Sequence, residues 1–169
     1  MLPESLVAAR KLLEEITPLQ TDCGLVCGGA CCQTHPGEET GMLLFPGEAE
    51  MYRGEDGFTL VDSPHGTILV CEGRCSRANR PLACRMFPLV MLLRPDGVKI
   101  ATDAAAQSVC PLAWQGKSAL SQDFVAAVRQ AANLLAQDDQ QAAHLRRLTD
   151  MQDELKALRA QYRGRKEHV

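Results

Sequence analysis

The sequence predicts a small α+β domain, in which short strands and a hairpin are flanked by an N-terminal helix and a C-terminal helical pair. Three observations lead to this prediction. Apolar residues recur at helical spacing near both ends of the 169-residue chain. Short apolar runs separated by turn residues occupy the middle. Eight cysteines, most of them in tight groups, lie between the terminal helices.

The first predicted helix covers residues 3–16. Its apolar residues recur three or four positions apart and therefore share one face. Pro3 is at the first turn, where a proline is tolerated. Thr17-Pro18 ends the pattern, because a residue that precedes proline avoids the helical conformation. In the cysteine-rich segment that follows, residues 22–32, three glycines make a long regular helix costly, so we expect a bent helical turn.

The middle of the chain predicts short strands. Residues 41–54 are typical of a short strand, a Pro-Gly break and one or two helical turns. Residues 58–75 predict two short strands around a turn at residues 63–66. The clearest hairpin covers residues 89–102, because two apolar runs flank Pro95-Asp96-Gly97, where glycine can supply a positive φ.

The last third of the chain predicts two helices. Ser121 is the expected N-cap of the first, and the second extends from about Gln140 to Tyr162. Apolar residues in the second helix repeat at steps of three and four, like a short coiled-coil seam. We expect this seam to pack on the body of the protein, more often on the helix over residues 121–136 than elsewhere, or else to pair with a second copy or a partner. The prediction therefore divides the chain into a cysteine-rich domain, residues 1–120, and a C-terminal helical extension, residues 121–169.

Composition and charge exclude several classes of function. The net charge of −3 lacks the basic balance of a general nucleic-acid binder. No apolar stretch approaches the roughly 20 residues that span a bilayer, and the first residues lack the apolar run of a secretory signal. We therefore expect a soluble, cytoplasmic protein without nucleic-acid or membrane partners.

The cysteines follow the pattern C-x3-C-x3-CC, then C-x3-C, then two single residues. Six of the eight lie in groups beside glycine or polar residues, unlike ordinary buried thiols, which are scattered singly. A reducing cytosol and two adjacent cysteines argue against disulfides. The C-x-x-C motif of a thiol redox site is absent. The pattern favours metal binding over these alternatives, since thiolate is a soft anionic donor. The residues are Cys23, Cys27, Cys31, Cys32, Cys71, Cys75, Cys84 and Cys110.

The spacing leaves both the metal and the number of sites open. Structural zinc sites usually contain C-x2-C knuckles, which this chain lacks. Iron–sulfur clusters also take four cysteines, and a Cys-Pro such as Cys110-Pro111 often closes their motifs. Eight thiolates could hold two four-cysteine sites or one polynuclear cluster.

The segments CGLVCGGACC, CEGRC and RPLACRMFPL, with a late CP, resemble the YkgJ-type family of zinc- or iron-chelating cysteine-cluster proteins. That family has C-x2-C-x2-CC followed by an Arg-Pro-x-x-Cys-Arg-x-Phe-Pro element, present here at residues 80–88. The first spacings are longer in this chain, and the resemblance covers residues 23–112. It implies a bound zinc ion or iron–sulfur cluster with all eight cysteines as candidate metal ligands, and it implies no particular reaction.

The Arg-Pro element also has a physical interpretation. Its two prolines fix the chain on either side of Cys84. Arg80 and Arg85 can offset the charge of several thiolates, and Phe87 can pack beside them and exclude water. The alternative is a surface loop with an ordinary Phe-Pro core anchor.

Among other residues, His35 is a candidate nitrogen ligand or a polar loop residue, and Trp114 is expected in the core.

Three functional hypotheses follow. The first is a cytoplasmic metal-binding protein that holds zinc or an iron–sulfur cluster in a structural, chelating or electron-transfer role. The alternative is an iron–sulfur-dependent enzyme, or an accessory subunit for modification of another protein. No serine-hydrolase, P-loop or zinc-protease motif indicates a different reaction. A protein partner bound through the C-terminal helix, or a homodimer, forms a third hypothesis.

Overall fold

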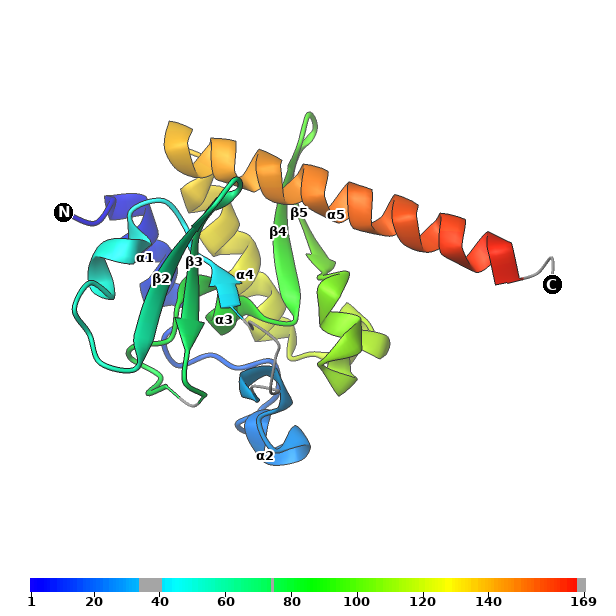
Figure 1. The fold of residues 1–169 in the computed structure, drawn as a ribbon, viewed down its shortest axis with the longest axis horizontal. Helices are drawn as coiled ribbons and strands as arrows, with labels where there is room; N and C mark the ends of the chain where they lie inside the picture. The colour runs from blue at the N-terminus through cyan, green and yellow to red at the C-terminus, as the bar shows by residue number, and fades with distance from the viewer. Residues whose placement is uncertain (34–40, 74, 167–169) are drawn as a thin grey trace.

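The structure is a computed structural model that describes residues 1–33, 41–73 and 75–166, with side chains up to residue 162. The predicted α+β class is confirmed, with helices at both ends and antiparallel strands between them (Figure 1). The helices and strands, in chain order, are α1 (Glu4–Leu12), α2 (Gly24–Cys27), β1 (Gly41–Leu43), β2 (Phe58–Ser63), β3 (Gly66–Cys71), α3 (Leu82–Met86), β4 (Leu89–Arg94), β5 (Gly97–Thr102), α4 (Gln122–Leu135) and α5 (Asp139–Lys166).

The strands form two small antiparallel sheets. One has three strands in the order β1-β3-β2, and the other is the β4–β5 hairpin. Ser63 pairs with Gly66 across the first predicted turn, and Arg94 pairs with Gly97 across the second. Both glycines have positive φ, 134° and 114°, a region that disfavours other residues. Both predicted strand pairs are therefore confirmed in position.

The main hydrophobic core lies where α1 and α4 pack together against the β4–β5 hairpin (Figure 1). It is built mainly of leucine, alanine and methionine, as expected from an aromatic content of 4%. The core draws on both halves of the chain, since residues from α1, α3, β4, α4 and α5 meet in one cluster. Its fully buried members include Leu6, Leu13, Leu82, Met91, Phe124, Val128, Leu135 and Leu145.

Helix α5 packs on the body of the protein, as expected, but chiefly on strand β4 rather than on the preceding helix. The Leu93 backbone N–H donates to Thr149 Oγ1 at 2.9 Å, and the Arg94 guanidinium makes a two-pronged ion pair with Asp153. These polar contacts fix α5 to the hairpin, and its C-terminal half extends beyond the body (Figure 1). No helix in the described part of the chain is long and apolar enough to cross a membrane.

Several local predictions differ from the structure. Helix α1 ends at Leu12 rather than residue 16, because the next two amides bond three residues back in a tighter turn. Ser121 is the N-cap residue of α4 but makes no side-chain cap hydrogen bond. Trp114 is 66% exposed rather than in the core, because it ends a short surface 3₁₀ turn. His35 lies outside the described residues.

Candidate metal centre

Four separate segments of the chain bring the eight cysteines together. Cys23 and Cys27 belong to the α2 turn, and the next pair ends the 3₁₀ turn Ala30–Cys32. Cys71 ends β3, with Cys75 four residues further on. Helix α3 carries Cys84, and Cys110 precedes the 3₁₀ turn Pro111–Trp114. All eight are thiols, and together they line adjoining pockets at one end of the molecule.

Two glycines create the bend in the first cysteine segment. Gly28 and Gly29 have φ of 66° and 72°, so α2 stops and the chain turns directly into the 3₁₀ turn. A side chain at either position would strain this left-handed backbone. The Asp22 carboxylate accepts the Gly24 N–H at 3.0 Å at the start of the segment. The expected bent helical turn is confirmed.

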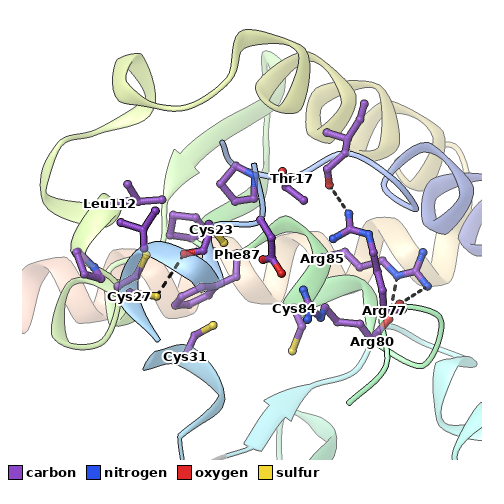
Figure 2. Close-up of a pocket in the computed structure, with 17 residues that line it drawn as sticks. Thr17, Cys23, Cys27, Cys31, Arg77, Arg80, Cys84, Arg85, Phe87 and Leu112 are labelled. Atoms are coloured by element: carbon purple, nitrogen blue, oxygen red, sulfur yellow. Dashed lines mark hydrogen bonds between the residues drawn. The ribbon is translucent and has the colours of Figure 1, made fainter. Parts of the chain in front are cut away.

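The first pocket is lined by cysteines from the first cysteine segment and by Cys110, the last cysteine of the chain. It has a volume of about 50 Å³, room for a few water-sized atoms. Cys23, Cys27 and Cys110 line it together with the apolar side chains of Phe87 and Leu112 (Figure 2). Phe87 thus lies beside the thiols, as predicted from the Arg-Pro element.

The second pocket lies between the three-stranded sheet and α3. It has a volume of about 70 Å³, and its walls include Cys32, Cys71 and Cys75 with Met42 and Leu69. The two remaining cysteines, Cys31 and Cys84, line both pockets. The pockets therefore adjoin, and thiols form a common wall between them.

Arg80 lies at the junction of these pockets. Its side chain lines both of them and a third pocket, of about 180 Å³, beside α2. It forms a side-chain hydrogen bond with Cys75. Its Nε is buried and has no hydrogen-bond partner among the described residues. A buried donor without a partner is costly, so this N–H favours an added acceptor such as a thiolate at the same place.

Arg85 has a different role from the one predicted for it. Its guanidinium donates to four backbone carbonyls, those of Arg10, Arg77, Ala78 and Arg80, at 2.9–3.2 Å. One of them belongs to the C-terminal turn of α1, where a positive charge also complements the helix dipole. Arg85 therefore joins α1 to the loop before α3, and its donors are directed away from the thiols.

Four of the thiols, those of Cys23, Cys31, Cys75 and Cys84, have a raised pKa and therefore keep their protons more firmly than isolated cysteines. Burial raises the pKa of Cys84, and the neighbouring charges of Cys75, Cys32 and Cys71 raise it further, whereas Arg80 lowers it. Burial likewise raises the pKa of Cys23. Thiolates this close together repel one another, and one arginine cannot neutralise them all. A bound metal ion supplies the positive charge that would hold several of these sulfurs deprotonated.

The sulfur atoms surround the pockets without closing on one point. Among residues 1–33, 41–73 and 75–166, no group of three or more cysteine, histidine or acidic side chains is arranged to hold a metal ion. Metal binding therefore requires these side chains to rotate toward one another, which their staggered χ1 wells permit. The soft donors, the small pockets and the unpartnered Arg80 Nε fit a thiolate-bound metal or cluster.

Helix α3, which carries Cys84, is held by a residue that the sequence did not single out. Glu48 is fully buried, and its carboxylate accepts the N–H of Leu82 at 2.7 Å and that of Phe45 at 3.3 Å. It also forms an ion pair with Arg10 of α1. The only sequence signal was an acidic residue directly after a Pro-Gly break, which is usually solvated.

Comparison of the chain with family models, curated proteins and solved structures gave no match. The resemblance to the YkgJ-type family therefore stays a prediction from its motifs. What supports a function is the arrangement of the thiols and of the residues that hold them.

Proposed function

We propose that the protein is a cytoplasmic metal-binding protein that holds zinc or an iron–sulfur cluster through its clustered cysteines. Its role is structural and chelating, or the transfer of electrons. The observation that carries this proposal is the meeting of eight thiols, from four separate segments, at the walls of adjoining pockets. Cysteines that serve only packing behave as small buried apolar residues, whereas none of these eight is fully buried.

The surroundings of the thiols support the proposal. Thiolate sulfur is a preferred donor for zinc and for iron–sulfur clusters. The Arg80 guanidinium offers positive charge and a buried N–H donor, both of which stabilise metal-bound thiolate. Phe87 and Leu112 exclude water from one side. When bound, zinc would crosslink the segments, and an iron–sulfur cluster would also accept and release an electron.

A second candidate is an iron–sulfur-dependent enzyme, or an accessory subunit for the modification of another protein. The observation that favours it is the apolar surface of α2. Leu25 and Val26 are 81% and 65% exposed, and they lie between the cysteines Cys23 and Cys27. Exposed apolar side chains beside a site are typical of contact with another protein. A metal centre at such a surface could act on a docked protein or exchange electrons with it.

Thiol protection tests the proposal directly. Reduced protein is freed of metal, and its thiols are counted with a chromogenic disulfide reagent before and after addition of zinc. The same count is made after reconstitution with iron and sulfide. We expect eight reactive thiols in the metal-free protein and strong protection under at least one condition. A denatured sample provides the control for the total. Eight reactive thiols under every condition would contradict the proposal.

A further inference from the structure

We infer that the eight cysteines divide into two four-cysteine metal sites. One site consists of Cys23, Cys27, Cys31 and Cys110, and the other of Cys32, Cys71, Cys75 and Cys84. This inference rests on the proposed function and deepens it, because the spacing of the sequence leaves one joint cluster equally open. Geometry, electrostatics and the pocket walls each contribute to the division.

The α2 turn and the segment before Pro111 define the first site. Cys23 and Cys27 are one helical turn apart, and Cys27 Sγ lies 3.6 Å from the Cys23 carbonyl oxygen. The charges of both Cys27 and Cys110 act on Cys23, which places these three thiols in one neighbourhood. Only the first pocket has all three in its wall.

The end of β3 and helix α3 define the second site. The charges that act most strongly on Cys84 come from Cys75, Cys32 and Cys71, and none of the cysteines of α2 is among them. The second pocket has these same four residues in its wall. Figure 2 shows Cys84 beside Arg80, apart from Cys23 and Cys27. Cys84 therefore belongs with the second site although it also lines the first pocket.

Cys31 and Cys32 are adjacent in sequence but belong to different sites. They lie in a 3₁₀ turn, in which successive side chains are about 120° apart around the axis. The two thiols still interact with each other, so this pair lies where the two sites adjoin. Cys32 lines only the second of the two pockets, whereas Cys31 lines both and is acted on by the charge of Cys23. With Cys84 in the second site, four thiols per site place Cys31 in the first. Cys31 thus completes the first site, and Cys32 the second.

Arg80 lies between the two sites and serves both. It lines both pockets, and its charge acts on Cys23 of the first site and on Cys75 and Cys84 of the second. Two sets of four thiolates leave net negative charge on each side even after a divalent ion or cluster is bound. The half-buried guanidinium of Arg80 between them reduces the repulsion that would otherwise disfavour simultaneous occupancy.

Metal stoichiometry and two single variants test the division. Protein purified without air is analysed for zinc, iron and acid-labile sulfide, and we expect two ions or two clusters per chain. Cys110→Ser should remove one half of the metal, and Cys71→Ser the other half. The double variant Cys110→Ser/Cys27→Ser should keep the same half as Cys110→Ser alone. The double variant Cys110→Ser/Cys71→Ser should lose nearly all of it.

Matched controls place a serine beside each changed cysteine. Val109→Ser and Glu72→Ser should keep the full metal content, and circular dichroism verifies that each variant is folded. One ion or one cluster per wild-type chain, or loss of all metal from either folded single variant, would overturn the division and leave the proposed function standing. Folded wild-type protein that binds no metal would overturn the proposed function, and the division with it.

Discussion

At the scale of single residues, two arginines of one motif have separate tasks. Arg80 is directed toward the thiols and keeps an unpartnered buried Nε among the described residues, whereas Arg85 is fully engaged with backbone carbonyls. The sequence predicts the same charge-offsetting role for both. The side-chain contacts of the folded protein separate them, and this separation gives a matched pair of variants.

Arg80→Gln is expected to weaken zinc binding about 10- to 100-fold, the usual cost of losing a group that hydrogen-bonds to metal ligands. Arg85→Gln should leave the affinity within about threefold but lower the free energy of unfolding by about 1–3 kcal/mol, because buried carbonyls lose their donors. Competition with a chromogenic chelator measures the affinity, and urea unfolding measures the stability. Equal losses of affinity in both variants would show that Arg80 has no special relation to the metal.

Glu48 is the second residue with a role that only the structure reveals. Glu48→Gln is expected to lower the free energy of unfolding by about 3 kcal/mol, because Arg10 then stays buried without its counter-charge. Glu50→Gln is the matched control. Its ion pair with Arg53 is exposed, and its loss should cost less than about 1 kcal/mol. Similar denaturant midpoints for the two variants would contradict the structural role of Glu48.

At the scale of elements, α5 combines a buried first half with an exposed second half. His144 is 1% exposed and contacts Phe45 with ring centroids 4.8 Å apart and ring planes tilted by 56°. Its buried Nε2 has no hydrogen-bond partner among the described residues. Burial lowers its pKa to about 4, and the charge of Arg147 adds to the effect. The folded protein therefore holds this ring neutral.

Protonation of His144 makes folding dependent on pH. Between pH 6.5 and about 4 the unfolded chain binds a proton on this ring and the folded chain does not, so stability falls as the pH falls through that window. The loss at pH 4.5 relative to pH 7 should be about 2–3 kcal/mol. Urea unfolding of the wild type and of His144→Leu at both pH values isolates the contribution of His144 to the loss of stability, because the other groups titrate alike in the two proteins. An equal loss in the variant would refute it.

The exposed half of α5 should be dispensable for folding. Leu158 and Tyr162 are 61% and 65% exposed, whereas Leu145 is fully buried. Removal of residues 157–169 is expected to change the melting temperature by less than about 3 °C, since little buried apolar surface is lost. Removal of residues 139–169 should prevent folding. If the exposed half binds a second copy, light scattering will show a dimer for the full chain. The protein that lacks residues 157–169 will then be a monomer. A large drop in melting temperature would show instead that this half is structural.

At the scale of the whole molecule, the features set by local sequence patterns were predicted, whereas those set by contacts between distant segments were not. The two strand pairs follow from alternating apolar runs around turn residues, and the bend after α2 follows from its glycines. The packing of α5 on β4 could not be predicted, because the same seam fits a helix or a strand. The buried Glu48 was missed for a similar reason, since its partners are 34 and 38 residues away in the chain.

The candidate site shows the same division between local and long-range information. Six of its cysteines lie in tight groups, which are typical of metal ligands, and the resemblance to the YkgJ-type family implied the full set of eight. Their grouping depends on how β3, α3 and the segment before Pro111 meet α2, which is set by the tertiary fold. Metal–sulfur bonds and the hydrophobic core are thus expected to stabilise different ends of one molecule.

Metal binding by the clustered cysteines is best tested through the content of zinc, iron and acid-labile sulfide in protein purified without air, together with its optical spectrum. We predict metal bound to folded protein. Iron with sulfide and an absorbance near roughly 400 nm would indicate a redox or catalytic centre. Zinc without sulfide would indicate a structural or chelating one. Folded protein that contains neither zinc nor iron would contradict a metal-binding function.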